Sequence, residues 1–294
     1  MIKKIIKFDN GVVGIVVAVL LIGLIVAVVS LIQAVYVPKW MEEREAEHME
    51  QVVTQFAQLK LAIDTHVANE QPLTPIASPI TLGNKELPYL MSLRAYGSLE
   101  ILSNSFNIKI DDGSFSSPLD KSFGTIKYTS MNGYFIDQSF IYENGAMITS
   151  QREGNMISMK PSISVDNTTQ NVTITFKMVN ITPVGGKTNG GGYGTTSILT
   201  EYYNTIPDLV NYIEISNVKN ITINTSYPNA WSLFMNWILE DVYPDDNDFN
   251  IITDVINNKV IIKFNPSNDS DVLVTNIKYK IVEIYSQIGP GWVE

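Results

Sequence analysis

The feature that most constrains this chain is an uncharged apolar run near its start, from Val12 to Val37. Its 26 residues contain only two strongly polar side chains, Ser30 and Gln33. As an α-helix the run would be roughly 39 Å long, more than the hydrocarbon core of a bilayer, which is about 30 Å thick. Because a water-soluble domain rarely holds such a segment, we expect it to lie in a membrane or inside a bundle of helices.

Charges and aromatic residues around the run predict its orientation. Three of the first seven residues are lysines, whereas residues 39–50, KWMEEREAEHME, are dominated by glutamate. The positive-inside rule therefore places the N-terminus in the cytoplasm and the chain after Pro38 outside. Tyr36 and Trp40 lie where an interfacial aromatic belt is expected, and Pro38 between them predicts a kink. No second run of about 18 apolar residues follows, so a single span is expected.

Residues 38–71 are expected to form an amphipathic stalk helix that continues the apolar run. Glutamates cover its early part, Pro72 ends it, and apolar residues recur at spacings of three and four: Met49, Val52, Val53, Phe56, Leu59, Ile63 and Val67. Such a stripe predicts a buried face. We expect Phe56, Leu59 and Ile63 to anchor the following domain on the helix.

The remaining residues, 72–294, read as a β-rich domain with one inserted helix. The helix is expected over Pro228–Leu239, with its three large aromatic residues on the buried side. Asn257-Asn258 predicts a hairpin turn. Short β-branched runs predict strands at Ser98–Leu102, Gly124–Tyr128, Asn171–Val179, Ile213–Ile215, Asn220–Thr225, Ile251–Ile256, Lys259–Phe264 and Val272–Ile284. The expected fold is α+β: a long N-terminal helix followed by an antiparallel β-sandwich-like domain.

Composition excludes several classes of function. The net charge of −10 disfavours nucleic acid as a partner, and the absence of cysteine excludes disulfides and thiolate chemistry. The two histidines, His48 and His66, fall on the stalk without an accompanying nucleophile. Asp245 to Asp248 reads as a solvated turn, and the glycine-rich residues 185–194 read as a hairpin loop. We therefore predict no catalytic, cofactor-binding or metal-binding residue, and a protein that is not an enzyme.

Asn-x-Ser/Thr sequons cluster in the C-terminal part of the chain. Each match alone is weak, but all six fall on the part predicted to lie outside, at Asn167, Asn171, Asn180, Asn220, Asn224 and Asn268. N-glycosylation is the favoured interpretation. The alternative is that these Asn and Thr residues serve turns and exposed strand faces.

A basic leader, MIKKIIKFDNG, followed directly by a hydrophobic helix, an amphipathic stalk and a β-domain resembles an archaeal type IV pilin. The stalk "VPKWMEEREAEHMEQVVTQFAQLKLAID" and the segment "ITINTSYPNAWSLFMNWIL" resemble pilin-like surface proteins. The resemblance implies a class III signal peptide over residues 1–11, cut between Gly11 and Val12 by a membrane prepilin peptidase. It also implies assembly by a platform into a helical homopolymer with residues 12–37 as the filament core.

In such a filament, small residues would permit close helix packing, namely Gly14, Ala18, Gly23, Ala27 and Ala34. The expected product is an extracellular filament with a glycosylated outer domain, inserted in the cytoplasmic membrane before assembly and serving adhesion or surface interaction. Bundling, conduction, motility and a minor-pilin role stay open. The alternative is a monomeric cell-surface protein on an uncleaved signal anchor, with a ligand-binding or adhesive β-domain.

Overall fold

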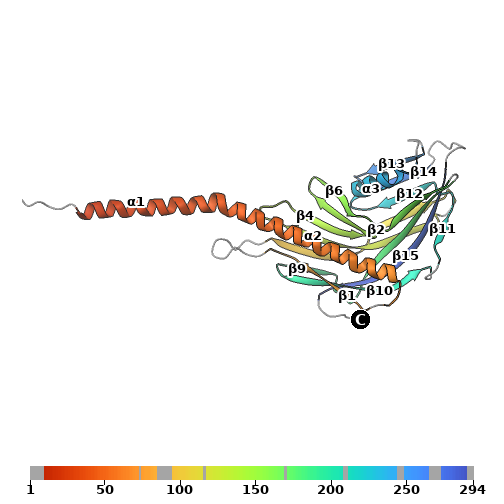
Figure 1. Cartoon of the computed structure of the whole chain (residues 1–294), viewed down its shortest axis with the longest axis horizontal. Helices are drawn as coiled ribbons and strands as arrows, with labels where there is room; N and C mark the ends of the chain where they lie inside the picture. The colour runs from red at the N-terminus through yellow and green to blue at the C-terminus, as the bar shows by residue number, and fades with distance from the viewer. Residues whose placement is uncertain are drawn as a thin grey trace, which may run out of the picture.

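A helical rod projects from a β-rich domain in the computed structural model of the chain (Figure 1). The structure describes residues 10–72, 74–84, 95–114, 117–168, 171–207, 211–243, 248–264 and 273–289. The rod consists of α1 (Asn10–Leu31), the π-helical turn η1 (Ile32–Tyr36) and α2 (Val37–Asn69). The α+β class expected from the sequence is confirmed: one long N-terminal helix precedes a domain of curled sheets.

The π-helical turn lies just before Pro38. Proline has no N–H to donate to the carbonyl four residues earlier, and the N–H of Val37 reaches back five residues to the carbonyl of Ile32. Figure 1 shows the rod changing direction where α1 meets α2, so the bend expected at Pro38 is present.

α2 packs one face against the β-domain. Met49, Phe56 and Ile63 are at most 2% exposed, as the apolar spacing predicted. Val53 was expected on the same face, but it is 37% exposed because it points to solvent with Leu61. α2 ends at Asn69, because the next residue, Glu70, has a left-handed conformation (φ 46°) and stops the helix two residues before Pro72.

The first sheet has six strands in the order β1-β10-β15-β8-β7, with β11 paired to β15. One pair departs from the expected antiparallel arrangement, since β8 and β15 run parallel over 13 register positions from Asn171↔Val274 to Pro183↔Ser286. A parallel pair needs a long connection, and β9 to β14 supply it. The bounds are β1 (Ile76–Thr81), β7 (Ile163–Asn167), β8 (Asn171–Pro183), β10 (Thr195–Ile206), β11 (Ile213–Ile215) and β15 (Val274–Ile288).

The second sheet has nine strands, all antiparallel, in the order β13-β14-β12-β2-β3-β4-β5-β6, with β9 paired to β2. β13 and β14 flank the turn that contains Asn257 and Asn258, so the predicted hairpin is confirmed. The glycine-rich segment is more than a loop, since Asn189–Gly192 forms β9. The bounds are β2 (Tyr96–Asp111), β3 (Leu119–Met131), β4 (Gln138–Glu143), β5 (Ala146–Gln151), β6 (Gly154–Met159), β9 (Asn189–Gly192), β12 (Asn220–Asn224), β13 (Phe249–Asp254) and β14 (Lys259–Phe264).

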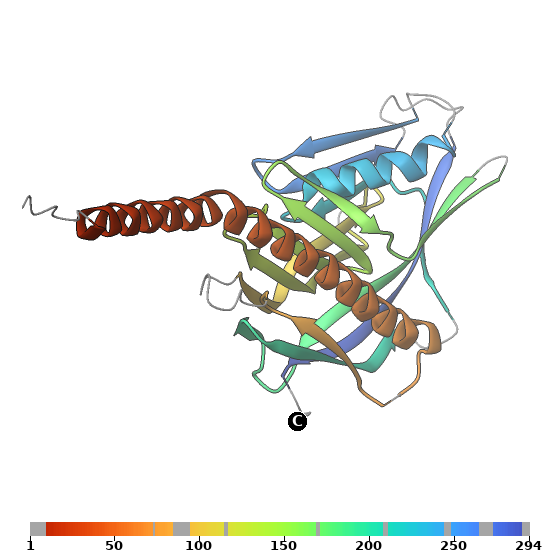
Figure 2. The same ribbon diagram turned by 60° about the vertical axis from the view of Figure 1, so that its left-hand side comes forward.

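Two apolar cores fill the domain, one beneath each of its helices. The first packs α2 against both sheets, and the second packs α3 (Pro228–Glu240) against both sheets. The two helices lie over different parts of the domain in Figure 2. On α3, Trp231 and Phe234 are buried as expected. Trp237 is 50% exposed instead, because it lies outside the core with the ammonium of Lys160 3.5 Å from its ring centroid.

Candidate membrane and assembly helix

The N-terminal half of the rod is apolar, and its side chains are exposed. Every side chain from Val13 to Leu31 is exposed, and Leu20 reaches 68%. By length and composition the rod is able to cross a membrane, and none of its most apolar window is buried. Burying a single Leu or Ile side chain contributes about 1.5–3 kcal/mol, so water is an unfavourable surrounding for this surface. Lipid tails or other apolar helices must cover it.

The small residues of α1 do not form one stripe. Gly14 and Ala18 are four residues apart, as are Gly23 and Ala27, so each pair shares a face within about 40°. Gly14 and Gly23 differ by about 180° and lie on opposite faces. A Cβ added at either glycine would meet no atom within 4 Å. The helix thus offers close approach on two sides, and Ala34 adds a small residue within η1.

The predicted cleavage bond, Gly11 to Val12, lies in the first turn of α1, which begins at Asn10. The rest of the predicted leader, residues 1–9, is outside the described residues. Cleavage itself stays a prediction.

The β-domain meets the rod immediately beyond the bare segment. Tyr36 and Trp40 are exposed, with ring centroids 5.9 Å apart, as an interfacial aromatic pair would be. Val37 and Met41 on the same turns are already buried, at 3% and 0% exposure. The apolar segment therefore passes into the domain contact without a flexible linker.

A buried glutamate fixes this junction. Glu45 is 1% exposed, and its carboxylate accepts hydrogen bonds from three successive backbone N–H groups: Gly133 at 3.0 Å, Tyr134 at 2.7 Å and Phe135 at 2.6 Å. The glutamates in the early part of the stalk are expected to face solvent, and Glu45 does not. The available signal was its spacing of four from Met41 and Met49, which places it on the buried stripe.

A second carboxylate fixes the far end of α2. Glu70 is 8% exposed, and its oxygens lie 2.7 Å from Nζ of Lys177 and 3.4 Å from Nζ of Lys280. Lys177 also donates to the carbonyl of Val67 at 3.2 Å. We call these two buried carboxylates, Glu45 and Glu70, the clamps of the stalk. They lie 25 residues apart, so helix and domain are joined at both ends of the contact.

Both histidines of the stalk lie at its contact with the β-domain. Nε2 of His48 is 3.0 Å from the carbonyl of Thr81, and Nε2 of His66 is 3.0 Å from the carbonyl of Thr200. Burial lowers the pKa of both imidazoles. The part of the chain that the structure describes brings no group of three His, Cys, Asp or Glu side chains together for a metal ion.

The sequons differ in accessibility. Asn167 and Asn224 are exposed, and Asn171 and Asn220 are half-buried at strand starts. Asn180 lies within β8, where its Oδ1 accepts from the N–H of Gly124 at 3.0 Å and its Nδ2 is shared at 3.4 Å with neighbouring side chains. Asn268 lies outside the described residues.

These features define a class of protein: a β-rich domain clamped rigidly to one N-terminal helix that is long and apolar enough to enter a membrane. The chain belongs to a family of unknown function, DUF7289, whose model matches residues 11–278. The match begins at the apolar helix, so the helix and the domain are one family unit. No curated protein and no solved structure matches the chain.

Proposed function

We propose that this protein is the structural subunit of a pilin-like extracellular filament that polymerises through α1 and η1. The observation that carries the proposal is the bare apolar helix joined without a linker to a clamped stalk. A plain membrane anchor needs only about 20 apolar residues and no fixed angle to its domain. A helical polymer needs both an apolar core and a repeated orientation of its outer domains.

Packing favours a bundle of helices around α1. When an apolar helix leaves lipid for other apolar helices, hydrophobic burial is nearly conserved, and close van der Waals contact decides the balance. Gly14 with Ala18 and Gly23 with Ala27 permit such contact on opposite faces. A subunit in a filament core has neighbours on more than one side, whereas a single helix dimer uses one face.

The proposed route begins in the cytoplasmic membrane, with the N-terminus inside and the β-domain outside. A prepilin peptidase removes the leader after Gly11, and an assembly platform extracts the helix into the polymer. N-glycans on the sequons then coat the outer surface, which serves adhesion or contact with surfaces. Self-association, rather than chemistry, is the activity.

Substitutions at Gly23 and Val19 test the proposal against a plain anchor. Gly23→Leu makes the helix more apolar but fills a close-approach position, whereas Val19→Leu is the control that adds one carbon at an already large residue. We expect both variants to reach the membrane and only Gly23→Leu to lose filaments in the fraction sheared from cells. If Gly23→Leu forms filaments like the wild type, the proposed helix packing is wrong.

The second candidate is a monomeric surface protein on an uncleaved anchor. The start of α1 at Asn10 favours it, because proteases cut extended segments more readily than helical turns, and the Gly11–Val12 bond lies in the first turn. If the protein is such a monomeric surface protein, Gly23→Leu should not change its location. The wild-type protein should then stay with the membranes after shearing. Negative-stain microscopy of cells with and without the chain separates the two candidates.

A further inference from the structure

Four large apolar or aromatic side chains are exposed together at one end of the β-domain. They are Tyr96, Met131, Ile136 and Tyr193, which are 36%, 60%, 55% and 49% exposed. Tyr96 of β2 lies opposite Met131 of β3 in the antiparallel register, so their side chains share one face of the sheet. The rings of Tyr96 and Tyr193 meet edge to face, with centroids 5.7 Å apart. We call these four residues the aromatic patch.

The loop between β3 and β4 holds Met131 and Ile136 in place. Nδ2 of Asn132 donates to the carbonyl oxygen of Ile136, 2.9 Å away, and the N–H of Asn132 donates to Oδ1 of Asp137 at 2.7 Å. Glu45 accepts hydrogen bonds from three further backbone N–H groups of the loop. A loop bonded in this way keeps two apolar side chains exposed, although covering them would be favourable.

The first turns of α2 determine the height of this loop above the apolar segment. Glu45, to which the loop is bonded, follows Trp40 by five residues, so the loop lies about 8 Å beyond Trp40 along the helix axis. Trp40 and Tyr36 form the pair expected at a membrane interface. The polar layer on each side of the hydrocarbon core is about 5–8 Å thick. When α1 spans a membrane, the loop therefore reaches the outer boundary of this layer.

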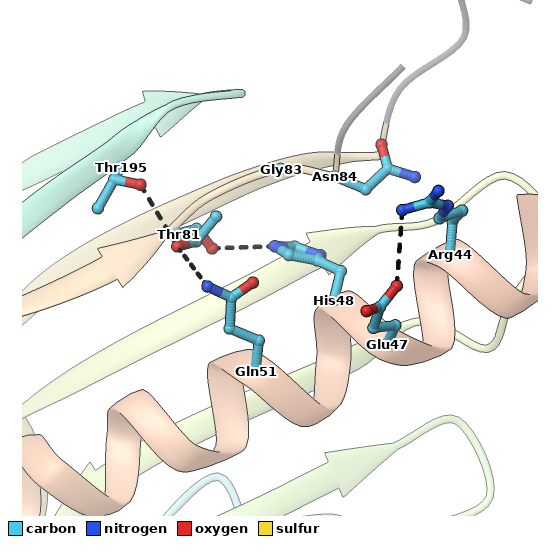
Figure 3. A pocket seen from close by; sticks show the side chains of 8 residues that line it. All are labelled: Arg44, Glu47, His48, Gln51, Thr81, Gly83, Asn84 and Thr195. Carbon is cyan, nitrogen blue, oxygen red and sulfur yellow. Dashed lines mark hydrogen bonds and ion pairs between the residues drawn. The ribbon is translucent and has the colours of Figure 1, made fainter. Parts of the chain in front are cut away.

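The tyrosine pair lies at the same end of the domain. Nε2 of His48 is bonded to the carbonyl of Thr81 at the end of β1, opposite the first residue of β10 (Figure 3). His66, further along α2, is bonded to the carbonyl of Thr200, further along β10. β10 thus runs away from α1, and Tyr193, which precedes it, lies on the side towards α1. In Figure 1, β4 and β9 likewise lie nearer to α1 than β13 and β14 do.

The composition and position of the patch match a lipid surface. Tyrosine is enriched at membrane interfaces, where its ring lies among apolar groups and its hydroxyl stays hydrated. Met131 and Ile136 add apolar side chains that carry no charge. A soluble partner protein would have to reach the patch on the side of the domain that faces the bilayer. We propose that the aromatic patch rests on the outer surface of the membrane that α1 crosses.

The proposed contact orients the β-domain on the bilayer. Because the clamps fix the angle between rod and domain, contact at the patch also fixes the tilt of α1 in the membrane. The inference rests on the membrane insertion of α1, which both candidates of the proposed function share, and it does not depend on filament assembly.

The charges at the height of the patch determine which lipid suits it. Lys39 and Arg44 are outnumbered on the exposed face of α2 by Glu42, Glu43 and Glu47. An anionic headgroup would be repelled there. Phosphatidylcholine, which has no net charge, is therefore the test surface.

Single cysteines can report the position of the patch, because the chain has none of its own. One fluorophore is attached to Ile136→Cys, Trp40→Cys or Ile256→Cys in full chains inserted one per phosphatidylcholine nanodisc. Ile256 supplies the matched control, since it is 93% exposed on the turn between β13 and β14. A lipid that carries a nitroxide on its headgroup quenches each label according to its distance from the bilayer surface.

We expect the nitroxide lipid to quench the labels of Trp40→Cys and Ile136→Cys several-fold more than the label of Ile256→Cys. Met131→Asp places a charge in the patch and should reduce quenching at Ile136→Cys. Val255→Asp, at a residue 54% exposed on the distant turn, should leave that quenching unchanged. Wild-type thermal unfolding in detergent would show that each variant is folded, as exposed positions allow.

Four results would overturn the inference. If Trp40→Cys is quenched and Ile136→Cys is no more quenched than Ile256→Cys, α1 enters the membrane but the patch does not touch it. If neither Trp40→Cys nor Ile136→Cys is quenched, the membrane step of the proposed function fails as well. Quenching at Ile136→Cys that Met131→Asp does not reduce would mean that the patch makes no contact of its own. An emission change of this label only when several chains share a disc would mean that a second copy covers the patch.

Discussion

Oε2 of Glu45 accepts a 2.6 Å hydrogen bond from the backbone N–H of Phe135, although the two residues are 90 positions apart. With two more N–H donors from the same loop, this carboxylate ties the first turns of α2 to the β3–β4 connection. The direction of the rod relative to the domain is thus set by a buried charge and three backbone donors.

Removing this clamp should destabilise the domain. Glu45→Ala leaves three N–H groups without their acceptor, and bonds to a charged group contribute about 1.5–3 kcal/mol each before relaxation and hydration. We expect a net loss of about 3 kcal/mol in the free energy of unfolding. Thermal unfolding of the full chain in detergent measures it. Glu43→Ala, an exposed glutamate on the same helix, should leave the midpoint unchanged; equal effects of the two substitutions would contradict the role of Glu45.

The buried face of the stalk should dominate its docking. Phe56 is 1% exposed, with its ring centroid 6.2 Å from that of Tyr128 and 6.0 Å from that of Phe140. Phe56→Ala should cost about 3–5 kcal/mol. Leu61→Ala, at a residue 66% exposed, should change stability by less than about 0.5 kcal/mol. A comparable loss at Leu61 in dispersed protein would mean that the docked face is assigned wrongly.

A buried carboxyl should make the domain less stable as pH rises. Burial raises the pKa of Glu143 from 4.5 to about 7, although Thr225 and Trp231 donate hydrogen bonds to it. The unfolded chain releases this proton near pH 4.5, and the folded chain keeps it to about pH 7. The stability from Glu143 is therefore full below pH 4.5 and falls by on the order of 3 kcal/mol as pH rises to 7.

Glu143→Gln isolates this effect, since the amide oxygen accepts the same bonds and does not titrate. The difference in unfolding free energy between wild type and variant should change steadily between pH 4.5 and 7, in favour of the variant at higher pH. A pH-independent difference would show that Glu143 is not the titrating group.

The two buried histidines should make the domain less stable as pH falls. Burial lowers the pKa of His48 and His66 below 6.5, so the unfolded chain binds these protons first as pH falls. Stability from the neutral rings is full above pH 6.5 and is lost as pH falls from 6.5 through their folded pKa values. His66→Gln, which keeps a donor for Thr200, should show a shallower acid loss than the wild type. An unchanged acid slope would count against His66.

Glycan occupancy should follow the accessibility of the sequons. Asn167 and Asn224 are exposed, whereas Asn180 is half-buried and hydrogen-bonded through both amide atoms. If the glycan is added to the folded domain, glycopeptide mass spectrometry should find the first two occupied and Asn180 bare. A glycan on every copy of Asn180, with none on Asn167 and Asn224, would contradict this prediction.

Local patterns predicted the local structure. The helix over the apolar run and stalk followed from composition and a period near 3.6, because these depend on neighbours within a few residues. The hairpin at Asn257-Asn258 and the helix from Pro228 followed from turn and cap residues. Gly11 and Val12, in contrast, mark a cleavage that only chemistry on the native protein tests.

Long-range relationships were not predictable in this way. The parallel pairing of β8 with β15 joins segments about 100 residues apart, and no local pattern encodes it. Trp237 fits the buried stripe of α3 by spacing, yet Lys160 covers it from a distant strand end. The burial of Glu45 is not encoded locally, because its three hydrogen-bond donors come from a loop about 90 residues further along the chain. The aromatic patch likewise exists only after β2, β3 and β9 pair.

The most direct test of the central claim is to identify the N-terminal residue of the protein by mass spectrometry. The protein is taken from the high-speed pellet of the material sheared from native cells. The filament proposal predicts that the pelleted protein begins at Val12, with the leader through Gly11 removed. Protein that still begins at Met1 and remains entirely with the membranes would contradict it.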